Sequence, residues 1–217
     1  TANRLSSGHC PWEVIDAVQL ACRKTEPIAV FRRDGLTKPR FTLPAPSHPA
    51  SSGKLIRQRR SALSLDGVTR LPRDTFYSMM AKVVPGTGDA PWDAIEWSGF
   101  VHLGLFVHRV EDLQPGLYAL VRDPAKLDFL KAKMKPDFQW SAPPGVPDGL
   151  PLYLLKEEDC RMTATSVSCG QDIAGDGVFS LGMLAEFEPA LARFGAHFYR
   201  NLFWETGMIG QVLYLEA

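Results

Sequence analysis

The stretch FVHLGLFVHRV, residues 100–110, is apolar at nearly every position. A run of this kind is typical of a β-strand whose two faces are both covered. The segments before it show helical spacing of apolar residues, whereas short apolar runs follow it at intervals. We therefore expect one domain with a mixed α+β core, in which the sheet begins near residue 100.

Working outward toward the C-terminus, three further apolar runs predict strands, and three intervening segments predict helices. The expected strands are LYALV, LPLYLL and VFSLGMLAEFE, at residues 117–121, 150–155 and 178–188. The expected helices are residues 123–134, a short helix within 157–170, and a last helical region that starts at Pro189.

Toward the N-terminus, helical spacing predicts a helix over residues 12–24 and another from Pro72 to Val83. The inner stripe of the second helix is Phe76, Met79, Met80 and Val83. A short helix ending in LIRQRRSALSLDGV, residues 55–68, is expected to pack Leu55 and Ile56 inward. The proline-rich segment between the first two helices predicts an extended arm of roughly residues 25–50. The domains are then 1–50, an N-terminal helix and arm, and 51–217.

Composition excludes several classes of protein. Lys plus Arg equals Asp plus Glu, at 24 each, so no overall basic field is present to hold nucleic acid. No apolar run is long enough for a membrane span, and the first residues carry no secretory signal pattern. The four cysteines lack metal-ligand spacing, which favours free thiols in a cytoplasmic protein.

His102 and His108 share one face of the strand at residues 100–110. A metal site would need a third ligand, and none is identifiable, so we interpret them as core or rim histidines and expect no metal.

The final segment, AHFYRNLFWETGMIGQVLYLEA at residues 196–217, is apolar almost all round. A helix of this kind is buried on most sides, either in a large core or in a subunit interface. We expect association through it. The chain also stops inside this pattern without a glycine stop signal, so we expect the protein to continue downstream.

The tripeptide RRS, residues 59–61, is a candidate anion site. Guanidinium forks offer paired donors to phosphate oxygens, and a serine hydroxyl adds a neutral donor. The alternative is an exposed helix end whose arginines pair with acids such as Asp66.

Three stretches, in this order, resemble the nitroreductase-like flavoprotein family, and within it the SagB-type (ThcOx-like) dehydrogenases. LIRQRRSALSLDG is similar to the family's RRSxRxF segment, and VEDLQPGLYAL is similar to its V-x-G-L-x-P-G-L-Y hairpin. FYRNLFWETGMIGQVLYLEA is similar to its long helix with E-x-G-x-x-x-Q-N. The resemblance covers residues 55–217.

The resemblance implies a three-layer α+β fold, with a mostly antiparallel sheet flanked by helices and preceded here by the extended N-terminal arm. It implies FMN at the interface of a homodimer or of two tandem halves, with a small-molecule or peptide substrate. Arg59 and Ser61 would contact the phosphate, and Ser98 and Gln211 would line the cofactor. Catalytic acid–base residues remain unassigned.

The chain departs from the family pattern at several places. The second basic residue of RRSxRxF falls on Leu63, and the aromatic falls on Leu65. Of the PSxGAxxP loop only Ser98 and Gly99 remain, and the glycine-rich strand that follows the long helix is absent from the sequence. Two hypotheses therefore stand. One is an FMN-dependent oxidoreductase, with azoline oxidation in modified-peptide biosynthesis as one such activity. The other is a non-catalytic half-domain that serves dimerisation or structure.

Overall fold

In the computed structural model the described residues are 8, 10–24, 51–86, 90–97 and 99–217. The helices are α1 Glu13–Ala21, α2 Ser52–Gln58, α3 Arg73–Lys82, α4 Leu127–Lys133, α5 Arg161–Val167, α6 Ile173–Asp176, α7 Phe187–Phe194 and α8 Tyr199–Glu216. Short 3-10 helices are η1 Trp92–Ala94, η2 Pro124–Lys126 and η3 Ala196–Phe198. The strands are β1 Val101–Val107, β2 Gly116–Leu120, β3 Leu152–Glu157 and β4 Phe179–Ala185.

These four strands form one sheet in the order β3-β2-β1-β4, and every neighbouring pair is antiparallel. The expected mixture of helices with an antiparallel sheet is therefore confirmed, and so is the start of the sheet directly after residue 100. The predicted arm of residues 25–50 lies outside the described residues.

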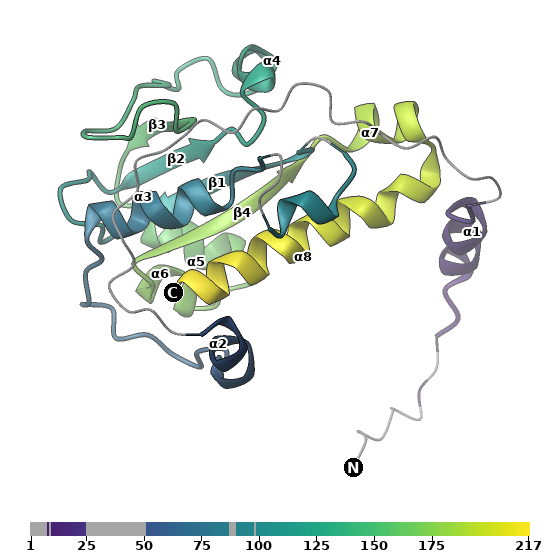
Figure 1. Ribbon diagram of the computed structural model, residues 1–217, viewed down its shortest axis with the longest axis horizontal. Helices are drawn as coiled ribbons and strands as arrows, with labels where there is room; N and C mark the ends of the chain where they lie inside the picture. Colours follow the sequence, from purple (N-terminus) through teal and green to yellow (C-terminus); the bar gives the residue numbers. More distant parts are fainter. Residues whose placement is uncertain (1–7, 9, 25–50, 87–89, 98) are drawn as a thin grey trace.

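One face of the sheet carries most of the core. Alternate residues of β1, namely Leu103, Leu105 and Val107, are fully buried on this face, as the period of two in a strand requires. They belong to one cluster with Phe76 of α3 and Ile209 of α8. Figure 1 shows α3 and the long α8 crossing the same side of the sheet. The apolar stripe that the sequence assigned to residues 76–83 is the stripe that packs here.

The other face of the sheet is covered at its two ends by polar contacts. His108, directly after β1, points its Nε2 at the carbonyl oxygen of Ala174 in α6, 3.0 Å away. At the opposite end of β1, His102 reaches Glu186, at the start of α7, with 3.1 Å between Nε2 and Oε1. The large apolar cluster therefore lies on one face of the sheet, and hydrogen bonds of two histidines link the other face to Glu186 and to α6.

Gly116 explains the PGLY turn that leads into β2. A Cβ at this position would overlap the carbonyl oxygen of Lys156 on β3. Only glycine lets the two strands approach this closely. The register between β2 and β3 shifts next to this point, between Leu117 and Tyr118.

One expectation about burial is wrong. Leu55 and Ile56 of α2 are 37% and 57% exposed, so they do not pack inward. This helix has seven residues and meets the body of the protein through its C-terminal end, beside α8, which leaves its apolar pair in solvent. The last helix is not buried on most sides within this chain, so of its two alternatives the large core is excluded and the subunit interface stays a prediction. Its buried residues are Leu202, Glu205 and Ile209, whereas Phe203 and Trp204 are more than half exposed.

Candidate functional site

Arg59 and Ser61 lie together at the C-terminal end of α8, where both contact Tyr214. The guanidinium carbon of Arg59 is 4.9 Å from the centre of the Tyr214 ring. The hydroxyl oxygens of Ser61 and Tyr214 are 3.5 Å apart. All three side chains are exposed. The predicted pair is thus brought together, around a tyrosine that sequence reasoning did not assign.

The neighbouring arginine is used differently. Arg60 donates from Nη1 to the carbonyl oxygens of Arg57 and Arg59, at 3.1 and 2.8 Å, and so caps the end of α2. The arginines lie at an exposed helix end, as the alternative predicted, but the predicted pairing with Asp66 is wrong. The carboxylate of Asp66 accepts hydrogen bonds from the backbone of Val68 and from Thr69. These bonds lower the pKa of Asp66 to about 2.

Of the other two predicted site residues, one lies within the described residues and one does not. Gln211 lies on α8 and is partly exposed, one helical turn before Tyr214. Ser98 lies outside the described residues. Leu63, where the family has a second basic residue, is 98% exposed and offers no hydrogen-bond donor from its side chain.

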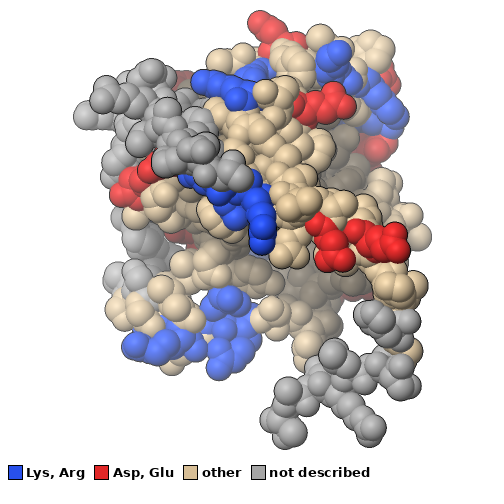
Figure 2. All heavy atoms as spheres, turned by 90° about the vertical axis from the view of Figure 1, so that its right-hand side faces the viewer, with Lys and Arg blue, Asp and Glu red and all other residues tan. Residues whose placement is uncertain are grey.

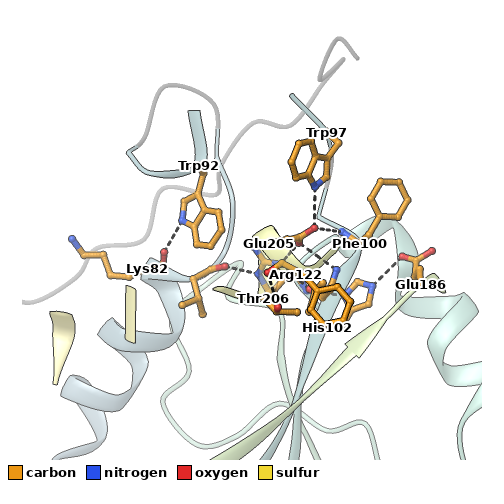
Figure 3. A network of polar contacts seen from close by, with 12 residues as sticks. Lys82, Trp92, Trp97, Phe100, His102, Arg122, Glu186, Glu205 and Thr206 are labelled. Atoms are coloured by element: carbon orange, nitrogen blue, oxygen red, sulfur yellow. Dashed lines mark hydrogen bonds and ion pairs between the residues drawn. The ribbon is translucent and has the colours of Figure 1, made fainter. Parts of the chain in front are cut away.

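A buried polar network lies on the inner side of α8, at Glu205 (Figure 3). This carboxylate is 0% exposed and accepts hydrogen bonds from the indole of Trp97 and from the backbone N–H groups of Phe100 and Val101, at 3.1, 3.1 and 3.3 Å. It also pairs with the guanidinium of Arg122. One glutamate thus ties the long helix to the first residues of the sheet.

Arg122 completes this network. Its Nε donates to the carbonyl oxygen of Val83 at 2.6 Å, and its Nη1 donates to that of Val101 at 2.8 Å. The guanidinium lies over the ring of Trp92 at 4.7 Å. Sequence reasoning noted Glu205 only as a motif letter. The available signal was a charged residue on the same helical face as Leu202 and Ile209.

His102 is a satisfied core histidine, as the sequence led us to expect. Its Nδ1 accepts the backbone N–H of Arg122 at 3.1 Å, so its Nε2 carries the proton that is donated to Glu186. Lys126 also pairs with Glu186, with 2.6 Å between Nζ and the other carboxylate oxygen. Among the described residues, no group of three His, Cys, Asp or Glu side chains is placed to hold a metal ion.

A cavity of about 410 Å³ lies beside His108, lined also by Arg109, Gln114, Pro115, Glu157, Glu158, Asp159 and Arg161. Its charges largely satisfy one another: Arg161 pairs with Asp159 at 2.6 Å, and Lys156 pairs with Glu158. The Nδ1 of His108 is sealed from solvent, so a ligand in the cavity would not reach it without rearrangement. We therefore assign no function to this cavity.

Figure 2, which shows the right-hand side of Figure 1, has charged residues of both signs in its upper part and a group of Lys and Arg without neighbouring Asp or Glu in its lower part. Within the described part of the chain, no helix has the length and apolar character needed to cross a membrane.

Comparisons with known proteins identify the fold. No model of a protein family matches the sequence, and no curated protein matches it. Among solved structures, the chain is similar to the crystal structure of a “putative nitroreductase” from Anabaena variabilis ATCC 29413, with a TM-score of 0.54 and 18% sequence identity. The match covers 76% of this chain and 29% of that chain. The fold is therefore nitroreductase-like, and this chain spans less than a third of that protein.

Proposed function

We propose that this chain is an FMN-binding domain of a nitroreductase-like oxidoreductase of the SagB type. One observation carries the proposal. Arg59 and Ser61 meet at Tyr214 on the surface, and among the described residues no ion pair occupies the Arg59 guanidinium. An exposed arginine beside two hydroxyls fits a phosphate group, because each phosphate oxygen accepts charged and neutral donors.

FMN, when bound, would supply hydride transfer between a donor and an acceptor. The residues of this chain would bind and orient it: Arg59 and Ser61 at the phosphate, with Gln211 one turn away on α8. The proposed substrate is a small molecule or a peptide. Azoline oxidation is the specific reaction that the SagB resemblance suggests.

A complete flavin site on this plan needs a second copy or a tandem half. Glu205 and Tyr214 are nine residues apart on α8, which at about 100° per residue places them roughly on opposite sides of the helix. Glu205 holds the segment around Gly99, whereas Tyr214 holds the arginine and serine. The phosphate site and that segment therefore do not converge within one chain.

The outer side of α8 supports association with such a partner. Phe203 and Trp204 are 59% and 57% exposed on this helix. A Cβ built on Gly207 or Gly210 meets nothing within 4 Å. Exposed aromatics beside bare glycines allow another helix to approach closely. Because the same patch can face its copy across a two-fold axis, a homodimer is the simplest arrangement, and a tandem half is the alternative.

The second candidate function is a non-catalytic half-domain, and Leu63 is the observation that favours it. Where a full phosphate cradle has another cation, this chain has a nearly fully exposed leucine. Such a site would hold FMN weakly or not at all, while the fold and the α8 surface would be kept.

Titration with FMN separates the two candidates. We expect the wild-type protein to bind FMN, so that the protein separated from free FMN absorbs at about 450 nm. Loss of one charge-assisted contact is worth about 1.5–3 kcal/mol, so Arg59→Ala should weaken binding roughly ten- to a hundredfold. Arg57→Ala is the matched control, because it removes the same charge from α2 and should change binding less than about twofold. If wild type forms a dimer and still does not bind FMN, the half-domain is correct.

Sedimentation tests the proposed partner surface. We expect Trp204→Arg to shift the protein to monomer, because a charge would be buried in the interface. Met162→Arg is the control, since Met162 is 81% exposed on α5, away from α8. A wild-type protein that is already monomeric would leave only the tandem half as partner. If wild type is a dimer, equal behaviour of the two variants would contradict the role of α8.

A further inference from the structure

We propose that Tyr214 is the third member of the phosphate site, where its ring positions Arg59 and its hydroxyl donates to the phosphate group of the ligand. The sequence pattern gave this tyrosine no role, but it is the residue that Arg59 and Ser61 both contact. The inference deepens the proposed function and rests on it where the phosphate is that of FMN.

The ring of Tyr214 holds the guanidinium of Arg59 in place. An exposed arginine samples many rotamers and loses that freedom when it binds a ligand. A guanidinium lying 4.9 Å above an aromatic face is already restricted, by attraction between the cation and the ring. The tyrosine therefore lowers the entropy cost of placing the charge at an anion.

The hydroxyl of Tyr214 adds a neutral donor beside that of Ser61. The two oxygens are 3.5 Å apart, at the limit of a hydrogen bond, so neither hydroxyl is strongly held by the other. Each can turn its proton toward a ligand oxygen. Two hydroxyls and one guanidinium together supply part of the hydrogen-bonding capacity that a basic residue at position 63 would give.

The end of α2 would oppose an anion here if it were uncapped, because the last carbonyl groups of a helix carry partial negative charge. Arg60 removes much of this effect, since its guanidinium donates to the carbonyl oxygens of Arg57 and Arg59. The two adjacent arginines therefore have different tasks. Arg60 neutralises the helix end, and Arg59, held on Tyr214, is left for the ligand.

Two substitutions separate the ring from the hydroxyl. Tyr214→Phe keeps the ring and removes the donor, and we expect FMN affinity to fall roughly three- to tenfold. Tyr214→Leu also removes the ring, and we expect a further loss of about threefold. Affinity for riboflavin, which has no phosphate, should stay unchanged in both. Tyr153→Phe is the control, because its ring lies on β3 against Trp140, away from α8.

Inorganic phosphate serves as a second ligand in the same titrations. If wild type binds FMN and both Tyr214 variants bind it equally well, the role of Tyr214 is overturned and the proposed function stands. If wild type binds phosphate but not FMN, and Tyr214→Phe weakens phosphate binding, the site is supported and the flavin function fails. Binding of neither ligand overturns both. Equal losses for FMN and riboflavin would show that Tyr214 acts on the fold instead of the phosphate.

Discussion

Arg122 and Arg59 each lie over an aromatic ring and each contact α8, yet their surroundings differ in every other respect. Arg122 is 1% exposed, pairs with the buried Glu205, and donates to two backbone carbonyls. Arg59 is exposed on the ring of Tyr214, where no described carboxylate pairs with it.

The difference separates an arginine of the scaffold from an arginine of the proposed binding site. A buried arginine must be neutralised within the protein, because an unpaired charge in the interior costs several kcal/mol. Its donors are then no longer available to a ligand. An exposed arginine costs little to leave unpaired, so its charge can serve an anion from solution. Substituting the first should therefore change the free energy of unfolding, and substituting the second should change ligand affinity.

The largest effect is expected at the buried pair. Glu205→Gln would remove the carboxylate charge that pairs with the buried guanidinium of Arg122, and we expect a loss of about 3–5 kcal/mol in the free energy of unfolding, measured by urea denaturation. A loss under about 1 kcal/mol for Glu205→Gln would show that the pair is not the scaffold element described above.

A smaller effect, of opposite sign, is expected at the surface site. Leu63→Arg restores the cation that the RRSxRxF pattern has at this position. We expect FMN affinity to rise roughly three- to tenfold, because an additional charge-assisted contact at an exposed site is partly screened. Stability should change by less than about 0.5 kcal/mol, since Leu63 is 98% exposed. Leu65→Arg, two residues further on, is the control. Unchanged affinity in Leu63→Arg would place the phosphate elsewhere.

The smallest effect is expected in the pH dependence of stability, which is set in part by the buried Glu186. Burial alone would raise the pKa of Glu186, but hydrogen bonds from His102 and Lys126 outweigh it and hold the pKa below the usual 4.5. Because the folded-state pKa is depressed, the stability that Glu186 contributes is present above about pH 4.5 and is lost as the pH falls through the folded value.

Glu186→Gln should therefore flatten the decline of unfolding free energy between roughly pH 5 and pH 3. The exposed Glu188, on the same helix, provides the matched control through Glu188→Gln. A Glu186→Gln variant that declines as steeply as wild type would exclude this source of acid sensitivity.

Sequence periodicity predicted the strands and most helices of this fold well, because apolar spacing reports directly on burial. The strand of residues 100–110 and the inner stripe of α3 are examples. It failed where burial depends on distant partners. Leu55 and Ile56 have the spacing of a buried helix face. A local pattern cannot predict that α2 contacts α8 with its C-terminal end, which leaves these two residues exposed.

The candidate site shows the same limit. The RRS motif identified Arg59 and Ser61, since motif residues are adjacent in the chain. Tyr214 is 153 residues from Ser61, and Glu205 is 83 residues from Arg122. Contacts over such separations are set by the packing of α8 on the sheet and on α2, which spacing alone does not define.

The most direct test measures the free energy of unfolding with and without FMN in three proteins: wild type, Arg59→Ala and Arg122→Leu. A ligand at 100 times its Kd should stabilise the folded state by about 2.7 kcal/mol. We expect wild type to show this increment, Arg59→Ala to keep the ligand-free stability and lose most of the increment, and Arg122→Leu to lose stability and keep the increment. The contrary result is an Arg59→Ala protein that is destabilised without ligand yet gains as much from FMN as wild type does.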